Sequence, residues 1–210
     1  MLIYVVRLPN TMLKIAISGK MGSGKTTLLN AIKDFHNKNH FILTGEDSNL
    51  VTRLSLADPV KEVASRYFGM PPNTKDRKLL QQIGQKFREI DPDVWVKLLN
   101  QRARDPERYA GQSDKWSAVI CDDVRFPNEA KALKDAGWIM IRLDVSEKEQ
   151  QRRLEKAYGE SWKEHWKNRN EVSETSLDDD TESWDYVFTD LHLDKINDAV
   201  EEIYEPFQLN

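Results

Sequence analysis

Short apolar runs alternate along this chain with longer stretches in which apolar residues recur every three or four positions. The short runs are rich in Val, Ile and Leu, which is typical of buried strands, and the longer stretches have the period of amphipathic helices. Strands are predicted at residues 13–18, 53–57, 117–121, 138–144 and 185–189. Helices are predicted at residues 25–36, 59–68, 75–90, 92–104, 127–136, 146–158 and 193–204. The alternation predicts a three-layer α/β fold, in which a five-stranded parallel sheet has helices on both faces.

Several of the predicted helices have recognisable ends. Asp58 and Asp91 each precede a proline, which is the pattern of an N-cap followed by proline in the first turn. Ser146 begins a Ser-x-x-Glu capping box. Gly69 and Gly137 are typical of helix C-termini.

No repeat or low-complexity linker interrupts the pattern, so one domain is predicted over residues 13–210. Residues 1–12 are set apart as an N-terminal extension, because Met12 precedes a second apolar run and can serve as an alternative start. Residues 158–181 fit neither period and mix tryptophans and basic residues with an acidic tract. We interpret that stretch as a mobile insert or lid.

The composition narrows the class of protein. Hydrophobic residues make up 39% and charged residues 31% of the 210 residues, as in a globular enzyme and not in a fibrous or disordered chain. The net charge of −4 provides no basic surface for nonspecific nucleic-acid binding, and the apolar run at 2–6 is too short to span a membrane. The single cysteine, Cys121, suits a reducing cytoplasm. We therefore expect a cytoplasmic protein with no nucleic-acid or membrane partner, and with Cys121 buried in a strand.

Residues 19–26 read GKMGSGKT, which matches the phosphate-loop pattern G-x-x-x-x-G-K-[ST] at every fixed position. The motif follows an apolar strand and opens a helix, so its backbone N–H groups can surround a phosphate at the helix N-terminus. Lys25 is expected to reach the β- and γ-phosphates of ATP, and Thr26 to bind Mg²⁺. The predicted nucleotide-binding residues are Gly19, Gly22, Ser23, Gly24, Lys25, Thr26 and Thr27.

A second chemical signal is the run AVICDDVR at residues 118–125, an apolar strand that ends in two carboxylates and an arginine. The carboxyl ends of parallel strands border the ligand crevice, so these side chains are expected to face the phosphates. Asp122 and Asp123 are candidate Mg²⁺ ligands, and Arg125 is a candidate for balancing charge on a transferred phosphoryl group. The alternative is a turn in which one aspartate caps a helix and Arg125 is solvated.

Taken together, five sequence blocks resemble the phage-type deoxynucleoside monophosphate kinases, a branch of the nucleoside monophosphate kinases. The resemblance extends over residues 13–203. The blocks read GKMGSGKT, LADPVK, RKLLQQIG followed by WVK, DVRFPNE and SETSLD. Two positions depart from the family pattern, because Val172 stands where many relatives have histidine and Thr189-Asp190 where they have asparagine.

The resemblance implies that residues 56–104 bind the acceptor monophosphate and that residues 146–181 form a lid over ATP. It implies acceptor contacts by Asp58, Lys61, Arg77, Gln81, Trp95 and Arg125, and roles in phosphoryl transfer for Lys25, Asp123, Arg125 and Arg153. A guanidinium suits a phosphate, an amide suits a base edge and an indole offers a stacking surface. On the residues alone, Arg77 and Gln81 are equally typical of a solvated helix face. Arg152 and Arg153 point about 100° apart on their helix, and we favour Arg153 as the phosphate contact.

The expected reaction is transfer of the γ-phosphoryl group of ATP, with Mg²⁺, to a deoxynucleoside 5′-monophosphate. Two alternatives stay open: another small-molecule kinase, such as a dephospho-coenzyme A or sugar kinase, and a regulatory module that binds ATP without catalysis. A short, acidic chain disfavours a nucleic-acid motor. Similar folds pair, so a homodimer is expected, in the host cytoplasm if the chain is phage-encoded.

Overall fold

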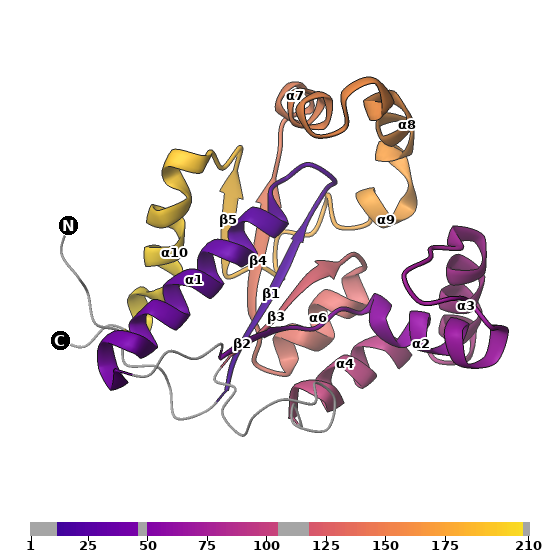
Figure 1. Cartoon of the computed structure of the whole chain (residues 1–210), viewed down its shortest axis with the longest axis horizontal. Coiled ribbons are helices and arrows are strands. Elements are labelled where there is room, and N and C mark those ends of the chain that lie inside the picture. Colours follow the sequence, from indigo (N-terminus) through magenta and orange to yellow (C-terminus); the bar gives the residue numbers. More distant parts are fainter. Residues whose placement is uncertain (1–11, 46–49, 105–117, 208–210) are drawn as a thin grey trace.

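A computed structural model describes residues 12–45, 50–104 and 118–207, and the predicted extension at 1–12 lies, apart from Met12, outside these residues. The described chain contains the predicted five-stranded sheet (Figure 1). Its strands are β1 (Leu13–Gly19), β2 (Val51–Arg53), β3 (Ala118–Val124), β4 (Ile139–Asp144) and β5 (Tyr186–Thr189). Their order is β2-β3-β1-β4-β5, and every neighbouring pair is parallel. The predicted α/β class and three-layer architecture are confirmed.

Helices cover both faces of the sheet. They are α1 (Lys25–Thr44), α2 (Ala57–Phe68), α3 (Arg77–Ile90), α4 (Val94–Arg104), α6 (Pro127–Asp135), α7 (Glu147–Tyr158), α8 (Trp162–Lys167), α9 (Val172–Thr175) and α10 (Ile196–Tyr204). Ile15 and Ile17 of β1 pack with α1 and α10 on one face, whereas Ala16 packs on the other face in the cluster that contains α2, α4 and α6. This alternation follows from the two-residue period of a strand.

The start of α2 differs from the sequence prediction. Residues 53–57 were expected to form a strand and Asp58 to cap the helix, but β2 ends at Arg53 and α2 begins at Ala57 with Leu56 as its N-cap. The Asp123 carboxylate accepts hydrogen bonds from the backbone N–H groups of Leu56 and Ala57. A side chain from a distant strand therefore caps the helix, and the sequence around the helix start gives no sign of this contact.

Other helix ends agree with the sequence in part. Ser146 caps α7 by accepting from the Glu149 N–H, and Gly69 ends α2 with a φ of 65°. Asp91 does not begin a helix: it ends α3, and α4 starts at Val94. Helix α1 runs well beyond residue 36, because its buried face continues to Asn39 before the chain turns at Gly45.

Helices α7, α8 and α9 lie beyond the carboxyl ends of the strands (Figure 1). Short helices and 3₁₀ turns thus occupy the stretch that fits neither period, and Trp162 and Trp166 meet edge to face with ring centroids 6.2 Å apart. The mobility of this region stays a prediction. Cys121 is fully buried in β3, as expected. Among the described residues, no helix combines the length and the apolar character needed to cross a membrane.

Candidate functional site

The loop between β1 and α1 has a backbone that its glycines make possible. Gly19, Gly22 and Gly24 have φ values of 152°, 77° and 103°, a region that residues with a Cβ rarely adopt. A Cβ on Gly19 would also lie 2.5 Å from both the Leu143 carbonyl oxygen and the Ser23 Oγ. The loop is therefore held in a tight curve at the N-terminus of α1, as the sequence motif predicts.

Two polar side chains of this loop are buried in a way that fits an anionic ligand. The Lys25 Nζ donates to the backbone oxygens of Gly19 and Lys20, and burial lowers the pKa of Lys25 to about 8. The Ser23 Oγ is buried and has no hydrogen-bond partner in the described part of the chain. Burying an unpaired hydroxyl and a desolvated amine is unfavourable without a ligand, and a phosphate would satisfy both. Thr26 is exposed in the first turn of α1, where its hydroxyl could hold Mg²⁺.

The two aspartates at the end of β3 have different surroundings, as expected for consecutive residues on a strand. Asp123 accepts hydrogen bonds from the Ser55 hydroxyl at 2.6 Å and from the two N–H groups that begin α2. Asp122 accepts a 2.7 Å bond from Arg53, and its charge acts on Lys25.

The Asp123 oxygens cap α2, and the predicted metal and catalytic roles of Asp123 stay predictions. Asp122 is the other carboxylate that could hold Mg²⁺ together with Thr26. No group of three or more His, Cys, Asp or Glu residues in the described chain could hold a metal ion, so a metal here would depend on phosphate oxygens and water for its other ligands.

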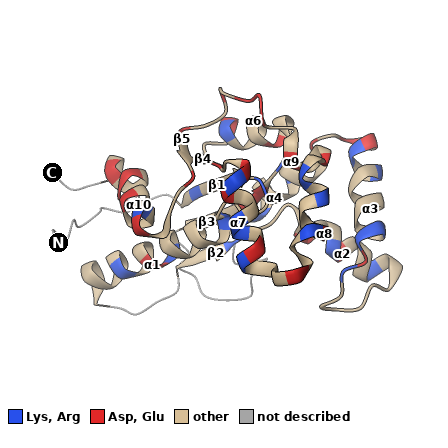
Figure 2. Ribbon diagram, turned by 90° about the horizontal axis from the view of Figure 1, so that it is seen from above, with Lys and Arg blue, Asp and Glu red and all other residues tan. Residues whose placement is uncertain are grey.

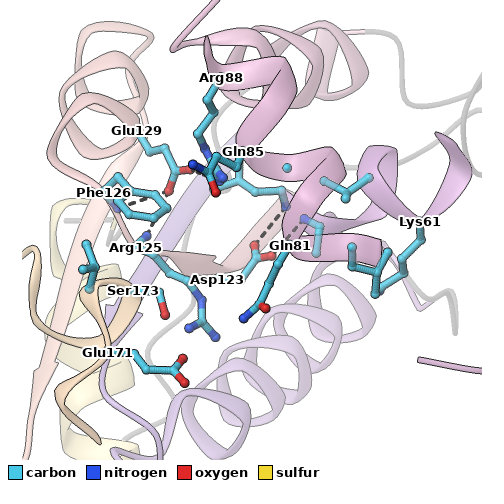
Figure 3. Close-up of a pocket in the computed structure, with 16 residues that line it drawn as sticks. Lys61, Gln81, Gln85, Arg88, Asp123, Arg125, Phe126, Glu129, Glu171 and Ser173 are labelled. Carbon is cyan, nitrogen blue, oxygen red and sulfur yellow. Dashed lines mark hydrogen bonds and ion pairs between the residues drawn. The ribbon is translucent and has the colours of Figure 1, made fainter. Parts of the chain in front are cut away.

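A cavity of about 520 Å³ lies between α2, α3, the turn after β3 and the start of α9. Helix α9 links it to the phosphate loop, because Glu174 accepts a hydrogen bond from the Met21 N–H. Lys61, Gln81 and Arg125, all predicted acceptor contacts, line it. Figure 3 shows the Arg125 side chain reaching into this space between Gln81 and Ser173. The cavity thus combines apolar and amide walls with charged groups of both signs, since Asp123, Glu129 and Glu171 also line it.

Three predicted acceptor contacts lie elsewhere. Trp95 is 1% exposed, and its indole N–H donates to the Gly84 carbonyl, so it belongs to the core and not to the cavity wall. Arg77 is exposed in the first turn of α3 and does not line the cavity. Asp58 forms a 3.0 Å ion pair with Lys61 and also lies outside the lining.

Several cavity residues had been given no role by the sequence, and three of them form a connected set. The Arg88 guanidinium lies 4.7 Å from the centre of the Phe126 ring and donates to Glu129. Glu129 is 2% exposed and accepts from the N–H groups of Arg125 and Phe126, while burial raises its pKa. This set fixes the backbone of the turn that carries Arg125. The Glu129 position within the DVRFPNE block was the only signal available for it.

The two adjacent arginines of α7 differ as expected. Arg153 donates to the Ser23 carbonyl at 2.9 Å and to the Leu191 carbonyl, so it contacts the phosphate loop, whereas Arg152 pairs with Glu149 on the surface. The bonds from both arginines lower the pKa of Glu149 to about 2. Arg153 binds the backbone of the loop; its predicted contact with phosphate stays a prediction.

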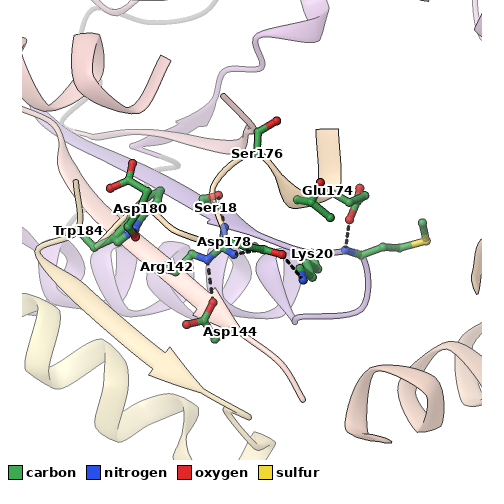
Figure 4. Close-up of polar contacts among 12 residues, drawn as sticks. Ser18, Lys20, Arg142, Asp144, Glu174, Ser176, Asp178, Asp180 and Trp184 are labelled. Carbon is green, nitrogen blue, oxygen red and sulfur yellow. Dashed lines mark hydrogen bonds and ion pairs between the residues drawn. The ribbon is translucent and has the colours of Figure 1, made fainter. Parts of the chain in front are cut away.

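The acidic tract after α9, at residues 178–180, takes part in ion pairs with distant residues. Asp178 pairs with the Lys20 Nζ at 2.7 Å and with Arg142 at 3.1 Å, and Arg142 also donates to Ser18 and Asp144 (Figure 4). Arg142 is 6% exposed. These contacts tie the tract to the phosphate loop and to the sheet. Seen from above, acidic residues gather on α10, while α2, α3 and α8 carry lysines and arginines (Figure 2).

No protein-family description matches this sequence, and no curated protein matches it either. Solved structures do match its fold. An uncharacterized protein from Eubacterium ventriosum ATCC 27560 superposes with a TM-score of 0.53 at 14% identity, over 93% of this chain and 99% of that one. A sugar kinase from Janibacter sp. HTCC2649 has a TM-score of 0.51 at 16% identity, over 93% of this chain and 95% of its own. TT1252 from Thermus thermophilus gives 0.50 at 15% identity, over 94% and 98%. The likeness shows a shared three-layer α/β fold.

Proposed function

We propose that this chain transfers the γ-phosphoryl group of ATP to a deoxynucleoside 5′-monophosphate. The observation that carries the proposal is that Arg125 lines the cavity and also pairs with Glu174, whose carboxylate accepts a hydrogen bond from the Met21 N–H of the phosphate loop. Direct phosphoryl transfer requires that donor and acceptor be held close together and that charge on the transferred group be stabilised, and an arginine between the two sites can serve both ends. The sequence resemblance to the deoxynucleoside monophosphate kinases supports the same reading.

The chemistry of the cavity favours a nucleotide acceptor. Its volume of about 520 Å³ falls within the range of small-ligand pockets. Leu56, Val60 and Leu80 give it apolar walls, and Gln81 and Gln85 add neutral amides. Apolar walls suit the faces of a base, amides suit its edge, and Arg125 suits the phosphate.

The proposed transfer needs little covalent help from the protein. A phosphate oxygen of the acceptor is already a nucleophile, so alignment and charge stabilisation are the main contributions. Lys25 and Arg125 would neutralise charge on the transferred group, and the backbone of the loop would orient the donor phosphates. Thr26 and Asp122 would hold Mg²⁺, which when bound shields the β- and γ-phosphates.

The decisive experiment is an ADP-release assay with Mg-ATP against each deoxynucleoside and ribonucleoside monophosphate, with an acceptor-free control. We expect acceptor-dependent turnover with at least one deoxynucleoside monophosphate. A panel of sugars and dephospho-coenzyme A tests the other small-molecule kinases, for which the sugar kinase of similar fold is a reason to look. ATP binding without turnover on any acceptor would favour a regulatory module instead.

A further inference from the structure

Glu174 of α9 makes two contacts that connect separate parts of the site. Its Oε2 accepts a 2.7 Å hydrogen bond from the Met21 N–H of the phosphate loop, and its Oε1 accepts a 2.9 Å bond from the Arg125 Nη1. The Glu174 side chain is 8% exposed, whereas that of Arg125 is 43% exposed. A nearly buried carboxylate with two donors is a fixed anchor, and the arginine is the group that it holds.

Glu174 lies in a short segment that contacts both the cavity and the phosphate loop. The three preceding residues, Glu171, Val172 and Ser173, line the acceptor cavity, and Glu174 itself contacts the donor loop. One short segment therefore borders the acceptor and holds the loop at the same time. Asp178, one turn further on, fixes the far end of this segment through Lys20 and Arg142.

We propose that Glu174 is a positioning residue for phosphoryl transfer, which holds the Arg125 guanidinium at the junction of the phosphate loop and the acceptor cavity. This inference rests on the proposed function. A half-exposed arginine samples many rotamers and loses conformational entropy each time it must meet the transferred group. The bond to Glu174 removes most of that freedom before substrate binds, and a preset geometry lowers the barrier to reaction.

The kinetic test replaces Glu174 by an uncharged amide of nearly the same size. In Glu174→Gln we expect kcat to fall roughly 10- to 100-fold, because a misplaced catalytic group has about that cost, while the KM for ATP changes less than about twofold. Glu174→Asp keeps the charge and should recover part of kcat. Asp179→Asn is the matched control, because it removes the same charge from an exposed position in the same segment, and it should leave kcat unchanged.

A double-mutant cycle separates positioning from a structural effect. If Glu174 acts through Arg125, adding Glu174→Gln to Arg125→Ala should slow the enzyme no further. Independent, multiplying effects of the two substitutions would overturn the proposal. An unchanged kcat in Glu174→Gln, or equal losses in kcat and in ATP affinity, would overturn it as well.

Chemical labelling tests the contact between Glu174 and Arg125 by a measurement that does not depend on catalytic activity. Phenylglyoxal modifies accessible arginines, and mass spectrometry of the Arg125 peptide gives the rate at that residue. We expect labelling of Arg125 to be severalfold faster in Glu174→Gln than in the wild type, and unchanged in Asp179→Asn. Equal rates in all three proteins would refute the anchor. Faster labelling with no acceptor-dependent turnover in the wild type would retain the anchor and reject the proposed function and the catalytic role that rests on it.

Discussion

The phosphate loop and the acceptor cavity lie next to one another, yet they are made in different ways. The loop consists of eight consecutive residues, and the groups expected to bind its ligand are mainly backbone N–H groups, held in place by glycines with positive φ. The cavity is lined by side chains from α2, α3, the turn after β3 and α9, which are far apart in the sequence. One side of the site is thus a local backbone structure and the other is an assembly of side chains.

This difference implies different responses to substitution. The backbone of the phosphate loop must keep one conformation to bind phosphate, so a single substitution in the loop should abolish phosphoryl transfer. Several side chains of the cavity wall contribute contacts to the acceptor. One substitution there should therefore lower the affinity for the acceptor and leave kcat unchanged. The predictions below test that contrast, beginning with the largest expected effect.

Lys25→Met should give the largest loss. The substitution removes the cationic side chain of Lys25, which is expected to reach the β- and γ-phosphates, and the loss of one such charge-stabilising group costs about 10²–10³-fold in kcat. Because burial already lowers the pKa of Lys25 to about 8, the fold gains little from the charged amine. We therefore expect a melting temperature near that of the wild type, measured by circular dichroism, together with the loss of ADP release.

Lys38→Ala, at an exposed position of the same helix, is the control for Lys25→Met and should keep full activity. Near-normal turnover in Lys25→Met would contradict the assignment of the loop as the donor site.

Two glycine substitutions compare the two sides directly. Gly19→Ala forces a Cβ to within 2.5 Å of backbone and side-chain atoms at a φ of 152°, so we expect the free energy of unfolding to fall by about 1–3 kcal/mol. Gly84→Ala, in α3 at the cavity wall, meets only the movable end of Arg88 at 3.4 Å. Alanine should stabilise this helix by about 0.5–1 kcal/mol while narrowing the cavity and raising the KM for the acceptor. Urea denaturation measures both changes, and a Gly19→Ala protein as stable as the wild type would count against the tight loop.

The pH dependence of ATP binding should report Lys25. In the empty protein its pKa is lowered to about 8, chiefly by burial, whereas a bound phosphate favours the charged amine and raises the pKa. Binding above pH 8 must therefore take up a proton, and affinity should fall by up to about tenfold per pH unit as the pH rises from 8. Calorimetry in buffers of different ionisation enthalpy would detect that proton. Lys25→Arg stays charged over this range, so its affinity for ATP should not change with pH. If the affinity of the wild type does not change above pH 8 either, Lys25 is not the group that takes up the proton.

The same contrast explains which parts of the fold and the site could be predicted from the sequence alone. The phosphate loop and the order of strand and helix around it follow from residues close in sequence. The contact of Arg153 with the Ser23 carbonyl joins residues 130 positions apart, and only the family resemblance pointed to Arg153. The start of α2 does not follow from nearby residues either, because Asp123 caps it from a strand more than sixty residues away. Trp95 was predicted to face the acceptor, but its place in the core depends on how α3 packs on α4.

Glu174 was visible in the sequence only as part of a family block. Its partners, Met21 and Arg125, lie 153 and 49 residues away. Such contacts depend on the packing of α9 against the end of the sheet, and no local period or motif encodes that packing. The side-chain assembly is the part of the site for which a structure was needed.

The smallest predicted effect belongs to the cavity wall. Gln81 lines the cavity with a neutral amide, and the loss of one such hydrogen bond is worth about 0.5–1.5 kcal/mol. Gln81→Ala should therefore raise the KM for the deoxynucleoside monophosphate roughly two- to tenfold, with kcat and the KM for ATP unchanged. Gln101→Ala, an exposed position on α4, is the matched control and should change none of these constants. A fall in kcat as large as that expected for Lys25→Met would mean that the acceptor wall is as intolerant as the loop, and the distinction between the two sides of the site would not hold.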